Sequence, residues 1–233
     1  MQPPLVVGFD LDLTLIDSRP GIAAAYRELS SRSGVYIDAD AAVTRLGPPL
    51  EEELARWFPA DQVTAAVAWY REIYPEFAVV ASPALPGAAE AFAAVRAAGG
   101  RVVVITGKYE PNARLHLDHL GLAADAVVGW VWAEAKTVAM TAHRAGVYVG
   151  DHPADMAAAL AVTWPDAAAR QLGARVVQRV GAQVAAVGVL TGDHAGAELV
   201  AAGAHAVLRD LTEFPAWLAA HLHRAAHLNG PDG

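Results

Sequence analysis

Acidic side chains follow short apolar runs at two places in this sequence of 233 residues. Asp10 and Asp12 stand two residues apart after the first run, and Asp151 and Asp155 stand four apart after a later one. Carboxylates from two such places can share a hard divalent cation, and Mg²⁺ prefers a few carboxylates together with waters and phosphate oxygens. One carboxylate in line with phosphorus can act as a nucleophile, and a neighbouring one can exchange a proton with the leaving oxygen and then with water. The spacing therefore indicates phosphoryl chemistry.

Two further side chains suit the same chemistry. Thr106 follows the apolar run 101–105, and its hydroxyl can donate a hydrogen bond to a phosphoryl oxygen. Lys136 opens the segment that leads to Asp151, and its ammonium can offset the charge of several clustered acids.

Alternating strands and helices are needed to bring these residues together. Residues 5–9 are nearly all apolar, which is typical of a strand buried on both faces of a parallel sheet. Further strands are expected at 101–105, 126–129, 147–149, 184–190 and 206–208, with helices at 88–98, 112–120, 136–145, 156–162, 198–202 and 214–227. This alternation predicts an α/β fold with a doubly wound parallel sheet. In such a sheet, ligands bind beyond the carboxyl ends of the strands.

A block without convincing strands separates the first strand from the others. Helices are expected within it at 21–33, 38–46, 50–58 and 61–74. The punctuation Ser82-Pro83-Ala84-Leu85-Pro86-Gly87 ends the block. We therefore predict a Rossmann-like core made of residues 1–17 and 82–233, with an inserted α-helical cap at 18–81.

Composition excludes several classes of protein. The net charge of −8 argues against a protein that binds a nucleic-acid backbone. The absence of cysteine excludes disulfides, thiolate zinc sites and cysteine nucleophiles. No segment approaches the length of a membrane span, and the N-terminus lacks the basic region of a signal peptide. A cytoplasmic protein with no nucleic-acid or membrane partner is the expectation.

Four motifs, in order along the chain, resemble those of the haloacid dehalogenase superfamily. They are Phe9-Asp10-Leu11-Asp12-Leu13-Thr14, Ile105-Thr106-Gly107, Lys136, and Gly150-Asp151-His152-Pro153-Ala154-Asp155. The helical block resembles a C1-type cap, and the turn Leu46-Gly47-Pro48-Pro49-Leu50 is similar to that of phosphoglycolate-phosphatase-like members. Together the four motifs are far more specific than any one of them.

The resemblance implies a role for each motif residue. Asp10 is expected to be the nucleophile and Asp12 the general acid and base; phosphatases of the superfamily carry this second aspartate and dehalogenases lack it. Mg²⁺ is expected on Asp10, the backbone carbonyl of Asp12 and Asp151, with Asp155 in support. Thr106, Gly107 and Lys136 are expected to contact the substrate phosphoryl group.

Three features depart from the family pattern. Leu13 stands where many members have glycine, and His152 stands where threonine or serine is more usual, which makes His152 a possible substrate contact. Residues 163–183 add a segment between a helix and the following strand. We expect this segment to contain a short helix and to lie far from the catalytic strand ends.

Several other residues offer weaker signals, and the structural interpretation is favoured for each. Asp193 lies in a second Gly-Asp-His, but no acid follows four residues later. Two histidine pairs with helical spacing are expected on solvated helix faces: His116 with His119, and His223 with His227. Trp130 and Trp132 are expected to pack at a sheet edge. The cap side chains that could face substrate are expected instead to stabilise helix surfaces: Arg45, Tyr70, Arg71 and Tyr74.

The leading hypothesis is a Mg²⁺-dependent phosphomonoester hydrolase that acts on a small phosphorylated metabolite through an aspartyl-phosphate. A phosphomutase of the same architecture is one alternative, and a catalytically silent binding or regulatory protein is another. Neither the substrate nor the choice between a monomer and a homodimer follows from the sequence.

Overall fold

Six parallel strands form the centre of the protein in the computed structural model, which describes residues 5–46, 48–163 and 184–227. The strands are β1 (Val6–Phe9), β2 (Arg101–Ile105), β3 (Ala126–Val128), β4 (Val147–Gly150), β5 (Ala185–Val189) and β6 (Ala206–Leu208). Their order in the sheet is β3-β2-β1-β4-β5-β6, so β1 pairs with β2 on one side and β4 on the other. The carboxyl end of β1 therefore lies at the topological switch point, where α/β sheets bind ligands.

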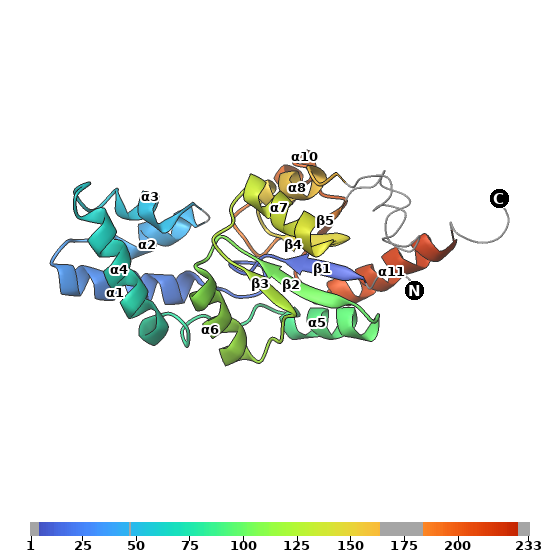
Figure 1. The fold of residues 1–233 in the computed structure, drawn as a ribbon, viewed down its shortest axis with the longest axis horizontal. Coiled ribbons are helices and arrows are strands. Elements are labelled where there is room, and N and C mark those ends of the chain that lie inside the picture. Colours follow the sequence, from blue (N-terminus) through green and yellow to red (C-terminus); the bar gives the residue numbers. More distant parts are fainter. Residues whose placement is uncertain (1–4, 47, 164–183, 228–233) are drawn as a thin grey trace.

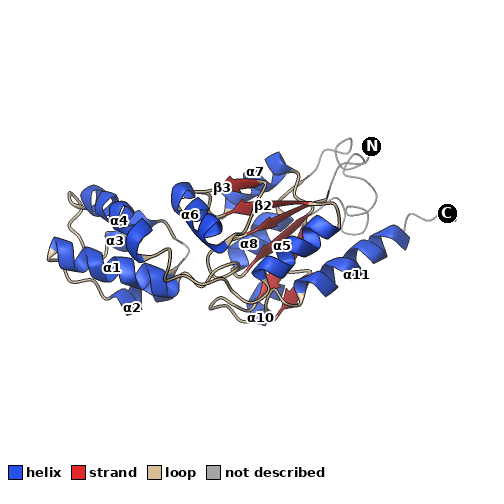
Figure 2. Ribbon diagram, turned by 90° about the horizontal axis from the view of Figure 1, so that it is seen from below, coloured by secondary structure: helices blue, strands red, loops and turns tan. Residues whose placement is uncertain are grey.

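Helices cover both faces of this sheet, as Figures 1 and 2 show. One face packs against α5 (Ala88–Ala97), α6 (Glu110–Leu120) and α11 (Phe214–His227). The other packs against α7 (Glu134–His143), α8 (Pro153–Leu160) and α10 (Gly196–Ala201). Along β1 the side chains alternate between the two layers: Val7 and Phe9 join the first core, and Val6 joins the second. The predicted doubly wound α/β fold is confirmed.

A group of helices lies beyond the carboxyl ends of the strands, at the left of Figure 1. Its elements are α1 (Arg19–Ser33), α2 (Ala39–Ala42), the 3₁₀ turn η1 (Val43–Arg45), α3 (Leu50–Leu54) and α4 (Val63–Phe77). They share a hydrophobic core of their own, in which the rings of Tyr26 and Tyr70 are 5.0 Å apart. We refer to these helices as the cap.

The chain leaves the sheet and returns to it through two adjacent segments. The Asp17 amide donates to the Pro83 carbonyl at 2.9 Å, and the Leu85 amide donates to the Leu15 carbonyl at 2.9 Å. The cap is therefore attached to the sheet by a paired crossing, beside which the predicted boundaries at 17/18 and 81/82 lie.

The predicted cap helices have different limits in the structure, and the second, expected at 38–46, is α2 followed by η1. The third was expected to reach Phe58 but ends at Leu54, because the amides of Arg56 and Trp57 bond to carbonyls only three residues back, ahead of Pro59. The fourth was expected to end at Tyr74 but continues through Pro75 to Phe77. The predictions for residues 163–183 concern a segment of which 164–183 lie outside the described residues.

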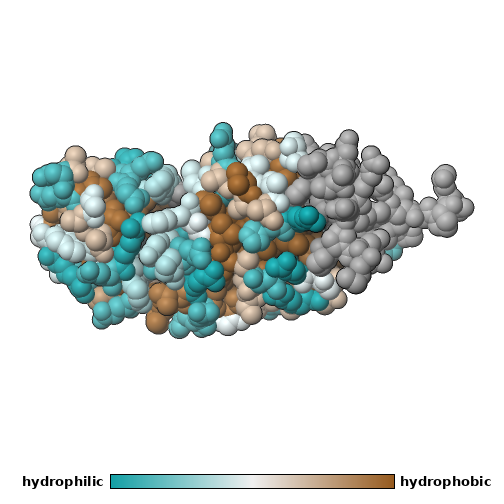
Figure 3. Space-filling view, viewed as in Figure 1, coloured by the Kyte–Doolittle hydropathy of each residue, from teal (hydrophilic) through white to brown (hydrophobic). Residues whose placement is uncertain are grey.

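Hydrophobic side chains gather on the core surface in the area where Figure 1 places β3 and α7 (Figure 3). The exposed large apolar residues include Trp130, which follows β3, and Val138, which belongs to α7. None of the helices in the described stretches has the length and apolarity to cross a membrane.

Candidate active site

Two buried carboxyl groups contact one buried ammonium group at the ends of β1 and β4. Lys136 Nζ lies 2.6 Å from Asp155 Oδ1 and 3.1 Å from Asp10 Oδ2. Asp155 belongs to the first turn of α8, where its Oδ2 accepts a hydrogen bond from the His152 amide at 3.2 Å. Because β1 and β4 are neighbours in the sheet, Asp10 meets Lys136 and Asp155, which lie more than 120 positions later in the sequence.

The electrostatic balance of this cluster favours an added cation. Burial is the main effect that raises the pKa of Asp10, to about 7, and the Asp155 and Asp12 charges add to it while Lys136 opposes it. Burial also raises the pKa of Asp151 well above its ordinary value, with Asp10 and Asp155 contributing. One ammonium therefore does not compensate for the buried acids.

The donor set fits a hard divalent cation. One carboxylate oxygen each from Asp10, Asp151 and Asp155 lies within 4.8 Å of the others. Both oxygens of Asp155 are already engaged, one by Lys136 and one by the His152 amide, so this residue is suited to support the site. Asp151 Oδ1 accepts a hydrogen bond from the Thr14 hydroxyl at 2.9 Å, which orients it towards Asp10. Oxygen-only donors of this kind suit Mg²⁺.

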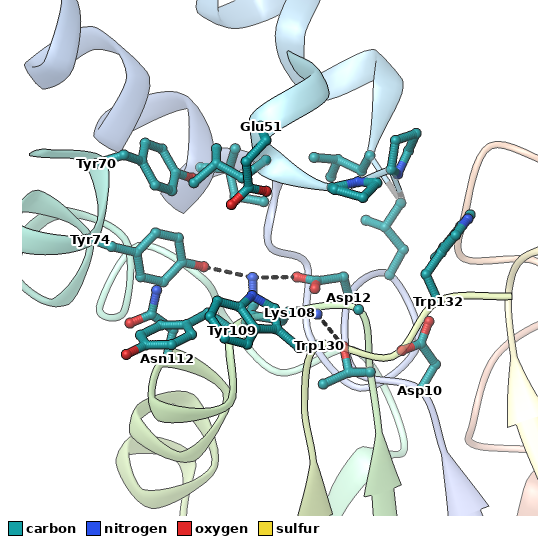
Figure 4. A pocket seen from close by; sticks show the side chains of 18 of the residues that line it. Asp10, Asp12, Glu51, Tyr70, Tyr74, Lys108, Tyr109, Asn112, Trp130 and Trp132 are labelled. Atoms are coloured by element: carbon teal, nitrogen blue, oxygen red, sulfur yellow. Dashed lines mark hydrogen bonds and ion pairs between the residues drawn. The ribbon is translucent and has the colours of Figure 1, made fainter. Parts of the chain in front are cut away.

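The side chain of Asp12 points away from that cluster and contacts Lys108, as Figure 4 shows. Lys108 Nζ lies 2.8 Å from Asp12 Oδ1 and donates to the Tyr74 hydroxyl at 2.8 Å; that hydroxyl lies 2.9 Å from His116 Nε2. Burial alone would raise the pKa of Asp12, but the Lys108 charge and hydrogen bond outweigh it and lower that pKa. Asp12 therefore faces the cavity as an ionised carboxylate next to a cap residue.

Thr106 and Gly107 occupy the end of β2 and line the cavity beside Asp10. Thr106 is 1% exposed, and its Oγ1 accepts a hydrogen bond from the Lys108 amide at 3.1 Å. Its hydroxyl hydrogen stays available for an acceptor in the cavity. All six predicted site side chains and Gly107 therefore lie at this end of the sheet, with Asp12 directed to Lys108.

The cavity between sheet and cap has a volume of about 200 Å³. Figure 4 shows Tyr70, Tyr74 and Glu51 of the cap facing Asp10 and Asp12 across it. Five residues for which a structural role was expected also line the cavity: Tyr70, Arg71, Tyr74, Trp130 and Trp132. Arg45 does have a structural contact, an ion pair with Glu53. His152, which was expected as a possible substrate contact, also lines the cavity.

The second Gly-Asp-His lies next to the first without supplying an acid to the cluster. The Asp193 side chain is 54% exposed and pairs with Arg19 at 3.6 Å. Gly192, however, packs directly against Asp151, and a Cβ there would overlap the Asp151 carboxylate. The His194 ring lies 4.4 Å from that of His152. This loop therefore forms a wall behind the acids.

Three residues were missed or misplaced by the sequence analysis. Lys108 stands three residues after the end of β2, and this closeness to a strand end is a signal for a site residue. Asn112 lines the cavity in the first turn of α6, and its sequence context carries no such signal. His116 was expected on a solvated face but is fully buried against Tyr74.

Comparison with known proteins agrees with this arrangement. The family model of haloacid dehalogenase-like hydrolases matches residues 7–160. The chain is 32% identical over 188 residues to the phosphoglycolate phosphatase of Rhodospirillum rubrum, covering 70% of this chain and 78% of that one. It is 34% identical over 122 residues to the tyrosine-protein kinase PtkA of Mycobacterium tuberculosis, which is 52% of this chain and only 42% of the kinase.

Among solved structures, a haloacid dehalogenase-like family hydrolase from Streptococcus pneumoniae superposes with a TM-score of 0.71. Its sequence identity is 21%, and the match covers 92% of this chain and 98% of that one, so this likeness concerns the fold. The matched family model spans all four motifs that carry the acids, the threonine and the lysine described above. The chain spans about half the length of the first curated relatives it matches, and it belongs to the haloacid dehalogenase-like hydrolase family.

Proposed function

We propose that this enzyme hydrolyses phosphate monoesters through a covalent aspartyl-phosphate on Asp10, with Mg²⁺ as cofactor. The observation that supports this best is the cluster of Asp10, Asp151 and Asp155, in which Asp10 and Asp155 contact Lys136. A relative of 32% identity is named a phosphoglycolate phosphatase, which is consistent with a phosphomonoesterase.

Asp10 would attack phosphorus with one carboxylate oxygen, and the bond from phosphorus to the ester oxygen would break. Asp12 would protonate the departing alkoxide and then, as a carboxylate, would remove a proton from the water that attacks the aspartyl-phosphate. This second attack releases inorganic phosphate and restores Asp10. The pairing of Asp12 with Lys108 suits the base role, and the charge of an incoming phosphoryl group would favour the protonated form required first.

The other residues would hold the phosphoryl group in place. Thr106 and the Gly107 amide would donate hydrogen bonds to its oxygens, and Lys136 would stabilise the negative charge around Asp10. Mg²⁺ held by Asp10, Asp151 and the Asp12 backbone carbonyl would add positive charge at the same oxygens.

Phosphate release from a panel of metabolite phosphate esters tests this proposal, with Mg²⁺ and with chelator. Release that depends on Mg²⁺ and disappears in Asp10→Asn is expected, because the amide cannot attack phosphorus. Acid quenching followed by mass spectrometry should find the phosphoryl group on the peptide containing Asp10. Isomerised product without free phosphate would instead indicate a phosphomutase. A folded protein that turns over no ester, or Asp10→Asn that retains more than a few per cent of the rate, would overturn the proposal.

A further inference from the structure

The cavity above Asp10 has walls rich in aromatic rings. Six tyrosine and tryptophan rings of the described residues line it: Tyr26, Tyr70 and Tyr74 from the cap, and Tyr109, Trp130 and Trp132 from the core. Tyr109 and Trp130 lie with their ring centroids 5.1 Å apart, and Trp132 packs against His152 at 5.1 Å. Such surfaces favour flat apolar groups that can stack on them.

Both basic side chains among the described lining residues already have acidic partners. Lys108 pairs with Asp12 at 2.8 Å, and Arg71 pairs with Glu51 at 3.2 Å. The Arg71 guanidinium also lies 4.9 Å from the ring centroids of both Tyr109 and Trp130. A carboxylate or second phosphate on the substrate would therefore have to displace an existing ion pair, and it would meet Glu51 or Asp12 nearby.

Asn112 offers an uncharged polar group to a ligand in the cavity. Asn112 is only 5% exposed, and its side-chain amide has no hydrogen-bond partner within the described stretches, although the residue lines the cavity. An amide that lines a cavity and has no partner can form hydrogen bonds with a ligand group. The amide offers both a donor and an acceptor, so it suits a hydroxyl, an amide or a ring heteroatom.

We infer that the alcohol part of the substrate is an uncharged, ring-containing group with a polar substituent that reaches Asn112. This inference rests on the proposed function and narrows it to one class of phosphate monoester. The cavity volume of about 200 Å³ is compatible with a phosphoryl group and a small ring system, since about 150 Å³ suffices for benzene. An uncharged, ring-containing substrate would distinguish this chain from an enzyme specialised for small carboxylated phosphates.

Three phosphates of primary alcohols test the substrate class without the advantage that a phenol has as a leaving group. They are 2-phenylethyl phosphate, n-butyl phosphate and 2-phosphoglycolate. We expect kcat/KM for the first to exceed that for each of the others by about tenfold or more, as transfer of a buried ring from water predicts. Equal or higher kcat/KM for 2-phosphoglycolate would overturn the inference and leave the proposed function standing.

Calorimetric measurement of how the three phosphates bind to Asp10→Asn makes the test independent of turnover. The three phosphates should bind in the same order of affinity as their kcat/KM values. If the wild-type protein is inactive, the proposed function is refuted, but these affinities still decide the substrate class. Tighter binding of 2-phosphoglycolate than of 2-phenylethyl phosphate would reject the inference.

Variants of lining residues test whether the preference for ring-containing substrates arises from the cavity. Trp130→Ala should raise KM for 2-phenylethyl phosphate by about three- to tenfold and change that for n-butyl phosphate little. Trp69, an exposed cap residue outside the lining, is the matched control, and Trp69→Ala should leave both values unchanged. Asn112→Leu should remove any advantage of 2-(4-hydroxyphenyl)ethyl phosphate over 2-phenylethyl phosphate. If Trp69→Ala and Trp130→Ala behave alike, or if Asn112→Leu leaves that advantage intact, the assignment is wrong.

Discussion

Lys108 Nζ lies 2.8 Å from Asp12 Oδ1 and, through the Tyr74 hydroxyl, links this core carboxylate to cap helix α4. The lysine side chain is 7% exposed, so its charge is balanced by Asp12 rather than by solvent. The ionisation of the proposed acid and base and the position of the cap are thereby connected through one ammonium group.

Lys108→Met should impair both activity and stability. Loss of the ammonium leaves the Asp12 charge and the Tyr74 hydroxyl without their partner, and we expect kcat/KM to fall by about 10- to 100-fold. The free energy of unfolding should fall by about 1–3 kcal/mol, because buried polar groups lose their hydrogen-bond partner. Phosphate release and urea denaturation measure the two effects. Wild-type values for both would show that the contact has no role in solution.

His116 should make the protein less stable in acid. Burial, with a contribution from the Lys108 charge, lowers the pKa of His116 to about 4 from its ordinary 6.5. Below pH 6.5 the unfolded chain therefore binds a proton at His116 that the folded protein excludes. The free energy of unfolding is unaffected by His116 above pH 6.5 and decreases as the pH falls towards 4.

Comparison with His116→Gln isolates this effect from other titrating groups. Between pH 7.5 and pH 5, wild type should lose about 2 kcal/mol more unfolding free energy than the variant does. His119, exposed on the same helix, provides the control, and His119→Gln should retain the wild-type pH dependence. Identical pH dependence for wild type and His116→Gln would contradict the prediction.

The two Gly-Asp-His sequences should differ in their response to metal. Asp151→Asn should raise the Mg²⁺ concentration for half-maximal activity by about tenfold or more, because it removes a charged oxygen donor. Asp193→Asn should leave it unchanged, since the Asp193 side chain is exposed and pairs with Arg19. A metal titration in which the two variants exchange behaviour would show that the wrong aspartate has been assigned.

Gly192→Ala should reduce activity while the protein stays folded. The added Cβ would overlap the Asp151 carboxylate, and a displacement of a site group by about 1 Å can cost about 100-fold in rate. Gly196→Ala is the control, because a Cβ there meets only the Leu190 and Val207 side chains at 3.5 Å, an ordinary contact. Phosphate release and a thermal melt of both proteins decide whether the two glycines differ as expected.

Glu51→Gln should increase activity towards carboxylated substrates. Removal of this carboxylate leaves Arg71 available to a substrate anion, so we expect kcat/KM for 2-phosphoglycolate to rise by about three- to tenfold. Glu52, exposed on the same helix outside the cavity lining, supplies the control variant Glu52→Gln. No gain in Glu51→Gln, or an equal gain in both variants, would show that the ion pair does not select against carboxylates.

Local sequence was sufficient to predict the site residues at the carboxyl ends of the strands. Asp10, Thr106 and Asp151 each follow a buried apolar run, and the ends of parallel strands must meet at one edge of a sheet. Lys136 and Asp155 came from the family resemblance together with the same argument. The doubly wound fold also followed from the alternation of short apolar runs with helical periodicity.

Only the tertiary structure decided what faces these residues. The contacts of Tyr74 with Lys108 and His116 join positions 34 and 42 residues apart, through the packing of α4 near α6. Helical periodicity shows that Tyr74 lies on an apolar face, but it does not show which surface that face covers. The cap core and the cavity wall draw on the same residue types, so the cavity became visible only once the cap was placed above β1.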